Sequence, residues 1–404
     1  MLNVKTPEEV IEIIETLLPN FECKSELVDL INACGRVLHF NISSDENVPD
    51  FNRSTVDGYA VRASDTFGCS ESMPAILNVV DEVMMGESAN VAITPGNCAI
   101  VSTGGALPET ADAVVMVEHS EDYGDGMVGM QKPVAPGNNV VFKGDDVTVG
   151  KLVLEAGKIL TPHDIGILAA LGHDKVAVRV KPVIGVISTG DELVPVSTKP
   201  TAGQVRDINT AMLLAVANEL GAEALDFGII KDDEKAICNA VLTAVEKCDI
   251  CLISGGSSAG ARDMTARVIE SEGELLLHGI AMKPGKPTIL GIVNGKAVFG
   301  LPGHPVAAYM VTELFVRPLL EKLTKSHVVR RSTDAQLSEA ISSNHGRAEY
   351  IAVTLDDNDS KNIANPIRGK SGLISSLSGV DGYICVPRDC EGLSKGDVVK
   401  VVYF

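Results

Sequence analysis

The stretch "LISGGSSAGARDM", from Leu252 to Met264, marks a change from one secondary structure to another. Apolar residues at 250–253 predict a buried strand, and helical spacing resumes at Met264. Three glycines, several serines and an Arg-Asp pair separate the two. Such a turn lets backbone N–H groups approach an anion at the positive end of a helix. It is neither a G-x-G-x-x-G nor a Walker sequence, so a tight connection without a ligand remains an open alternative.

The segments around this turn alternate between apolar strands and amphipathic helices. Residues 182–189, 224–230 and 249–254 are largely apolar runs, and residues 208–220 and 233–247 have helical spacing. Apolar strands that alternate with helices predict a doubly wound parallel sheet covered on both faces. Ligands bind beyond the carboxyl ends of the strands in such sheets.

The chain of 404 residues is long enough for several domains, and its composition changes along its length. We expect four parts. They are residues 1–45 joined with 147–180 as an N-terminal helical linking domain, 46–146 as a β-rich inserted domain, 181–325 as the α/β domain, and 326–404 as a small C-terminal β domain.

Three helices are expected outside the α/β segment. Thr6 to Glu9 form a capping box with proline at the first helical position, which predicts that a helix begins there. A second helix is expected from Ser25 to about Cys34, and a third around residues 162–172.

Composition excludes several classes of protein. Hydrophobic residues make up 45% of the chain and charged residues 22%, as in globular proteins. A formal net charge of -20 argues against nucleic acid and anionic membranes as partners. No apolar run approaches the roughly 20 residues of a membrane span, and the first residues do not resemble a signal peptide, so a cytoplasmic protein is expected.

The nine cysteines include a single C-x-x-C, formed by Cys248 and Cys251. Residues three apart on a strand point to opposite faces, so we expect structural thiols, with a zinc site as the alternative. Disulfides are not expected in the cytoplasm.

Carboxylates follow each of the three predicted parallel strands. Asp191 and Glu192 follow the first, Asp232 and Asp233 the second, and Asp263 the third. Carboxylates beside an anion-binding turn are how proteins hold Mg²⁺ against a phosphate, so Asp232 and Asp263 are candidate ligands. The alternatives are a solvated acidic turn at the first strand and a helix N-cap at Asp232.

Two further segments carry candidate residues. Lys283 and Lys286 lie among prolines and a glycine in "AMKPGKP", which restrict the backbone. We expect an ordered oxyanion site there, and the alternative is two solvated surface lysines. His304 in "GLPGHP" is expected to be structural. Taken alone, Asp57 in "RSTVDGYAV" is a turn residue.

Taken in order, the motifs "RSTVDGYAV", "STGGALPETADAVVMVE", "GDD", "STGDEL", "GGSSAGARD", "KPGKP" and "GLPGHP" resemble those of the molybdopterin molybdenumtransferase (MoeA) family, which includes the C-terminal domain of gephyrin. The resemblance spans about residues 6–390. It implies an elongated homodimer whose site lies between the α/β domain of one subunit and the β-rich domain of the other. It also implies that adenylylated molybdopterin is bound, molybdate or tungstate is inserted, and AMP is released with Mg²⁺.

The resemblance assigns roles to residues of this chain. The residues matching the family's functional acids and threonine are Asp57, Thr103, Glu192, Asp232 and Asp263. The expected pterin and phosphate contacts are Gly255, Gly256, Ser258, Pro302 and Pro305. The expected molybdate contacts are Lys283, Lys286, Arg347 and Ser376. The molybdopterin adenylyltransferase and acceptor molybdoenzymes are candidate protein partners.

Some positions depart from the family's pattern. His304 occupies a position where the family usually has asparagine, and Val56 one where it usually has methionine. The stretch before Gly144 often carries several arginines in the family, but here Lys143 is its only basic residue. Two other functions share features with this chain. A molybdopterin adenylyltransferase has the same type of α/β domain but lacks the flanking ones, and a receptor-clustering scaffold could lose the charged residues that this chain keeps.

Overall fold

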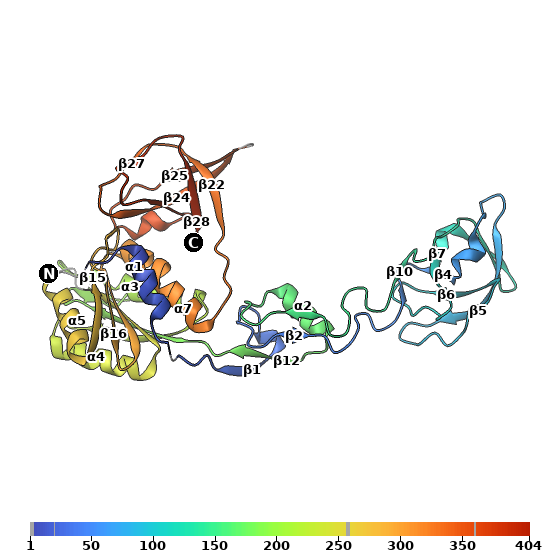
Figure 1. Cartoon of the computed structure of the whole chain (residues 1–404), viewed down its shortest axis with the longest axis horizontal. Helices are drawn as coiled ribbons and strands as arrows, with labels where there is room; N and C mark the ends of the chain where they lie inside the picture. Colours follow the sequence, from blue (N-terminus) through green and yellow to red (C-terminus); the bar gives the residue numbers. More distant parts are fainter. Residues whose placement is uncertain (1–3, 20, 256–258, 359–360) are drawn as a thin grey trace.

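The computed structural model describes residues 4–19, 21–255, 259–358 and 361–404. The molecule is elongated, with a β-rich part at one end and two packed parts, one α/β and one β, at the other (Figure 1). A narrow linking part lies between the two ends. No helix in the described ranges is long and apolar enough to cross a membrane.

The α/β part is built on a six-stranded sheet in the order β16-β13-β17-β21-β20-β18. The first four strands are parallel to one another, and β20 and β18 are antiparallel additions. The strands are β13 (Val183–Thr189), β16 (Glu223–Ile230), β17 (Ile250–Gly255), β18 (Gly273–His278), β20 (Ile289–Val293) and β21 (Lys296–Leu301). The predicted strands at 182–189, 224–230 and 249–254 are therefore confirmed.

Helices cover both faces of this sheet, because alternate residues of the central strands point to opposite sides. Ile250 and Leu252 of β17 pack with one group of helices, while Cys251 and Ile253 pack with the other. The first group is α1 (Pro7–Thr16), α3 (Ile208–Glu219), α6 (Pro305–Val311) and α7 (Arg317–Thr324), and the second is α4 (Glu234–Lys247) and α5 (Ala259–Glu272). The predicted helices over 208–220 and 233–247 are confirmed.

Helix α1 begins with the expected capping box, in which Thr6 and Glu9 exchange hydrogen bonds. Its apolar residues Val10, Ile14 and Leu17 join the α/β core. The structure thus places this helix on the α/β part and not in the linking part, because its apolar stripe finds its burial there.

The cysteine pair occupies one buried cluster, contrary to the opposite faces that the spacing indicated. Cys248 is the C-cap of α4 and precedes the strand, so it does not follow the alternation of β17, which carries Cys251. Burial raises the pKa of Cys248 to about 11 and that of Cys251 well above its usual value. Both thiols are therefore protonated at neutral pH, and all nine cysteines are free.

The linking part joins the two ends of the molecule. Strand β1 (Ser25–Asp29) pairs antiparallel with β12 (Lys175–Arg179). The helix expected around residues 162–172 is confirmed as α2 (Pro162–Ala170), which packs beside them. The helix predicted from Ser25 to Cys34 is wrong: the chain forms β1 and a 3-10 turn at Leu30–Asn32. The residues that pair with this strand lie 146 to 154 positions away, so a local pattern cannot reveal them.

The β-rich part contains a six-stranded sheet in the order β7-β4-β6-β5-β9-β8. Its strands are β4 (Gly58–Val61), β5 (Ala75–Val83), β6 (Asn97–Val101), β7 (Ala113–Met116), β8 (Ser120–Gly124) and β9 (Met127–Met130). Two apolar clusters fill it, one around Val115 and Met130 and one around Val101 and Val114.

The C-terminal sheet has the order β19-β24-β25-β22-β28-β26. Its strands are β22 (Ser332–Leu337), β24 (Ala348–Asn358), β25 (Lys361–Pro366), β26 (Gly382–Val386) and β28 (Val398–Tyr403). The edge strand β19 (Met282–Lys283) comes from the "AMKPGKP" segment of the α/β part and pairs in parallel with β24. The two parts are thus joined by backbone hydrogen bonds where the predicted oxyanion lysines lie.

Candidate functional site

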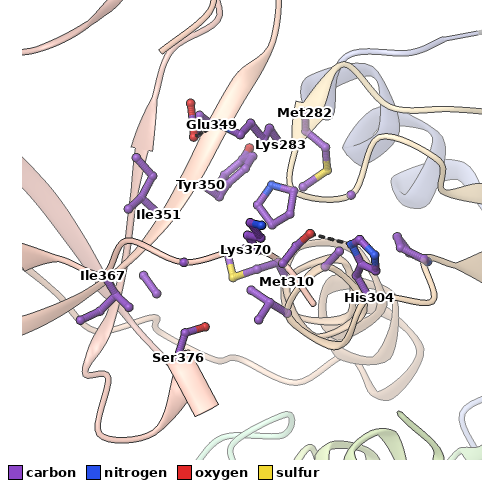
Figure 2. A pocket seen from close by; sticks show the side chains of 18 of the residues that line it. Met282, Lys283, His304, Met310, Glu349, Tyr350, Ile351, Ile367, Lys370 and Ser376 are labelled. Carbon is purple, nitrogen blue, oxygen red and sulfur yellow. Dashed lines mark hydrogen bonds and ion pairs between the residues drawn. The ribbon is translucent and has the colours of Figure 1, made fainter. Parts of the chain in front are cut away.

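A cavity of about 930 Å³ lies where the α/β part meets the C-terminal sheet. Its lining brings together five of the residues expected at the site, and Figure 2 labels two of them, Lys283 and Ser376. The five are Lys283, Lys286, Pro302, Arg347 and Ser376. These residues are up to 93 positions apart in sequence, so tertiary packing assembles the site.

The lysine segment is held by close packing around its glycine. Gly285 has φ +113°, and an added Cβ would lie 2.8 Å from Val311 Cγ2 of α6. The Gly285 carbonyl accepts a hydrogen bond from the Thr288 hydroxyl at 2.7 Å. The backbone is therefore fixed, while the side chains of Lys283 and Lys286 are exposed toward the cavity they line.

The cavity is cationic although the chain is strongly acidic. Five lysines and arginines line it, and Arg368 and Lys370 are members that sequence reasoning missed. Arg368 donates to Glu339 Oε1 at 2.7 Å. Glu349 is the one carboxylate in the lining as far as the structure describes it. A concentration of positive charge in a concave surface attracts small anions.

Glu349 was also missed from the sequence. Its Oε1 lies 2.6 Å from Lys283 Nζ, and its Oε2 accepts a hydrogen bond from Ser343 at 2.7 Å. The available signal was its spacing of two residues from Arg347, since residues two apart in an extended chain share a face. Both side chains line the cavity.

The "GLPGHP" segment divides between the cavity and the core. Pro302 lies in the lining, whereas Pro305 is buried as the first residue of α6 and is outside it. His304 is the N-cap of α6, and its Nδ1 lies 2.8 Å from Ser371 Oγ of the C-terminal part. Ser371 also accepts the Val306 N–H through its carbonyl at 3.1 Å. His304 therefore links the two parts and also lies in the cavity lining, so its expected structural role stays a prediction.

Ser376 lies in a 3-10 turn at Ile374–Leu377, on the C-terminal side of the cavity. Its hydroxyl donates to the Leu373 carbonyl at 2.7 Å. Ser376 Oγ is therefore left as an acceptor in this conformation, and it must rotate to donate to an oxyanion.

A second group of candidate residues lies at the carboxyl ends of β13 and β16. Asp232 Oδ1 is buried and has no hydrogen-bonding partner, and the Asp232 N–H lies 3.4 Å from Asp191 Oδ1. Burial raises the pKa of Asp232, and the charges of Asp191 and Glu192 raise it further. The helix N-cap is instead Asp233, which accepts from Ala236 N at 2.9 Å.

This acidic group fits a cation chemically, because an unpartnered carboxylate oxygen beside two further carboxylates lacks a positive counterpart. Among the residues that the structure describes, no three His, Cys, Asp or Glu side chains lie together in a way that could hold a metal ion. Gly256, Ser258 and the side chain of Asp263 lie outside the described residues, so a Mg²⁺ site stays a prediction.

Gly255 ends β17 beside the end of β13. An added Cβ there would lie 2.2 Å from both the carbonyl oxygen and the hydroxyl of Thr189. Glycine is therefore needed for the two strand ends to approach each other, whether or not a ligand binds there.

Asp57 and Thr103 lie together in the β-rich part. Asp57 Oδ1 accepts from the Thr103 N–H at 2.7 Å and from its hydroxyl at 3.0 Å. These bonds, the backbone one first, lower the pKa of Asp57. Strand β4, which Asp57 precedes, is at the end of the molecule remote from α4 and α5 (Figure 1). A single subunit therefore does not bring Asp57 to the cavity.

Comparison with known proteins covers nearly the whole chain. Residues 5–172 match the family described as MoeA N-terminal region (domain I and II), residues 185–322 a "probable molybdopterin binding domain", and residues 334–404 the MoeA C-terminal region (domain IV).

Individual relatives agree with these matches. The molybdopterin molybdenumtransferase of Bacillus subtilis is 32% identical over 100% of this chain and 95% of its own. That of Haemophilus influenzae is 35% identical over 75% of this chain and 74% of its own. The crystal structure of a molybdopterin biosynthesis moeA protein from Pyrococcus horikoshii OT3 superimposes with a TM-score of 0.85 at 34% identity, covering 99% of this chain and 100% of that one. The chain therefore belongs to the MoeA family of molybdopterin molybdenumtransferases, and it is a transferase of molybdenum cofactor biosynthesis.

Proposed function

We propose that this protein inserts molybdate into adenylylated molybdopterin and releases AMP. The observation that carries the proposal is the cationic cavity, since five lysines and arginines line it in a chain of net charge -20. Molybdate is a dianion, and charge-assisted donors are the groups that bind it most strongly. Tungstate has the same shape and charge, so the same donors would accept it.

The cavity also has room for more than an oxyanion. Its volume of about 930 Å³ is that of a site for an organic ligand. Met310 of α6 and Ile351 and Ile367 of the C-terminal part give the cavity apolar surface on both sides (Figure 2). In the proposed arrangement the donors hold molybdate, and the apolar surfaces hold the organic part of the substrate.

Individual donors have distinct roles in this arrangement. Lys283 and Lys286 offset the charge of molybdate, and the fork of Arg347 can bind two oxygens at once. Ser376 adds a hydroxyl at the C-terminal side. The Gly255 turn and Pro302 contact the pterin or its phosphate, and Pro305 supports them from the core.

The acidic group beyond β13 and β16 would serve the phosphate chemistry. Asp232 and Asp263 would hold Mg²⁺, with Glu192 beside them, and the unpartnered Asp232 Oδ1 supports this assignment. When bound, the metal neutralises phosphate charge during the release of AMP. Without the metal, the negative charge of these carboxylates would repel the phosphate, so phosphate would bind there only together with the metal.

We further propose that the active form is a homodimer. Asp57 and Thr103 would complete the site of the partner subunit, because they lie at the far end of their own (Figure 1). The linking part carries apolar side chains that a partner could cover, with Leu27 67% exposed and Ile31 83% exposed.

The test is direct. Purified protein is incubated with adenylylated molybdopterin, molybdate and Mg²⁺, and AMP is measured by chromatography while cofactor is measured by activation of a molybdenum-free molybdoenzyme. We expect both products to depend on molybdate. Pyrophosphate release from ATP and molybdopterin would instead identify an adenylyltransferase. The absence of AMP with folded protein would overturn the proposal.

A further inference from the structure

The Lys283 ammonium is engaged by a carboxylate at the wall of the cavity. Its Nζ lies 2.6 Å from Glu349 Oε1, and Figure 2 shows the two side chains meeting at one edge. The Lys283 side chain is 54% exposed and that of Glu349 only 12%, so the carboxylate is the more firmly embedded partner.

Glu349 is itself held from two sides. Ser343 donates to its Oε2 at 2.7 Å. Its backbone lies opposite Lys283 in the parallel pairing of β19 with β24. Both carboxylate oxygens therefore have a donor, and the lysine is the member of this trio with freedom to move.

We propose that Glu349 is a positioning residue that holds the Lys283 ammonium, so that an oxyanion must compete with Glu349 to bind it. The proposal rests on the function proposed above, and it adds a residue that sets oxyanion affinity. An ammonium shared between a fixed carboxylate and a ligand gives the ligand only the difference between the two interactions. A dianion gains more from that exchange than a monoanion, because Coulomb attraction scales with charge.

A second pair in the lining offers a matched contrast. Arg368 Nε lies 2.7 Å from Glu339 Oε1, close to the separation in the Lys283 pair. Here both partners are open to water, with side chains 72% and 46% exposed, and Glu339 is outside the lining. Exposed ion pairs contribute little, so the same change at Glu339 is a control.

The test changes the length of the side chain at position 349 while keeping its negative charge. Glu349→Asp keeps the charge but shortens the side chain by one methylene, so it no longer reaches Lys283 in the same geometry. Molybdate binding to the full-length protein is measured by titration calorimetry at fixed pH and ionic strength. The proteins are the unmodified chain, Glu349→Asp, Lys283→Ala and the double variant. Glu339→Asp is the control.

We expect Glu349→Asp to bind molybdate roughly threefold to fivefold more tightly than the unmodified chain, the upper part of the scale measured for partly exposed ion pairs. In the Lys283→Ala background the same change should alter the dissociation constant by less than about twofold, because no ammonium remains to be released. Glu339→Asp should also change it by less than about twofold. Ser343→Ala removes a donor that holds the Glu349 carboxylate in place, so it should also tighten molybdate binding. This variant replaces Glu349→Asp in the test if Glu349→Asp does not fold.

Other results would overturn the proposal. Unchanged or weaker binding in Glu349→Asp would mean that Glu349 does not compete for Lys283. Equal tightening with and without Lys283 would mean that the change reshapes the cavity. If the unmodified chain binds no molybdate at all, the cavity is not an oxyanion site, and the proposed function fails with the inference.

Discussion

Thr103 donates two hydrogen bonds to one oxygen of Asp57, from its backbone N–H at 2.7 Å and from its hydroxyl at 3.0 Å. Both favour the ionised carboxylate, and the backbone bond is the larger cause of the lowered pKa of Asp57. The two residues are 46 positions apart, so the fold and not the local sequence brings them into contact.

The first prediction removes one of these bonds. Thr103→Val keeps the N–H but not the hydroxyl, so the pKa of Asp57 should rise toward its usual value. If Asp57 works as a carboxylate, the acid limb of the kcat/KM profile should move to higher pH, while Thr103→Ser should keep it in place. The same sign holds for stability: the contribution of the pair is present above the unfolded pKa of 3.8 and is lost as pH falls through the lowered folded value. Superimposable profiles for the two variants would contradict this role.

The second prediction concerns Asp232. Its folded pKa is raised by burial and then by Asp191 and Glu192, so its ionisation destabilises the fold. The penalty begins as pH rises above the ordinary value of 3.8 and is complete above the raised folded pKa. Asp232→Asn should therefore raise the thermal midpoint at pH 7–8 in the absence of divalent metal. Added Mg²⁺ should stabilise the unmodified chain and so reduce the difference in thermal midpoint between it and Asp232→Asn.

Asp233→Asn is the control for that experiment. Asn caps a helix about as well as Asp, so its midpoint should barely change. An Asp232→Asn protein that is less stable at pH 8 than the unmodified chain would contradict the assignment of an unpartnered carboxylate.

The third prediction tests why glycine follows Asp57. A Cβ on Gly58 would lie 1.9 Å from the Val115 carbonyl oxygen of the neighbouring strand. Gly58→Ala should destabilise the β-rich part by about 1–3 kcal/mol, measured by urea unfolding. Gly166→Ala, in helix α2 with nothing within 4 Å, should instead stabilise the linking part by up to about 1 kcal/mol. Equal effects of the two changes would show that space at Gly58 is not limiting.

The fourth prediction compares the two lysines. Lys286→Ala should raise the molybdate concentration needed for half-maximal rate by roughly tenfold to a hundredfold, the loss of a charge-assisted bond. Lys283→Ala should raise it further, because it also leaves the charge of Glu349 in the cavity without its cation. Both changes should raise the concentration of adenylylated molybdopterin needed for half-maximal rate by much less than they raise that of molybdate. Equal weakening of both substrates would indicate that the lysines bind phosphate or support the fold.

The fifth prediction tests a shared site. At a limiting molybdate concentration, the Asp57→Ala and Lys286→Ala proteins should each have little activity alone. Refolding them together should restore part of the activity, because one of the two sites in a mixed dimer then has both intact halves. Sedimentation should show a dimer at micromolar concentration. If the subunits exchange but no activity is recovered, the site is not shared as proposed. Asp57 and Lys286 would then act in a site built by one subunit, or one of them would not belong to the site.

The local sequence determined the elements whose signals are local. The alternation of apolar runs and helical spacing predicted β13, α3, β16, α4 and β17, because burial on a sheet or helix face fixes the period of apolar residues. The capping box at Thr6 and Glu9 likewise needed only neighbouring residues. The motif order carried the family, and it pointed to Lys283 and Arg347 before any contact was known.

Tertiary structure alone decided what depends on distant partners. Strand β1 exists because β12 supplies its hydrogen bonds, and α1 joins the α/β core because its apolar stripe is buried there. Glu349 meets Lys283 because β19 pairs with β24, across 66 residues of sequence. Local propensity cannot encode such contacts, since their free energy arises only when the chain has brought the two surfaces together and paid the entropy of doing so.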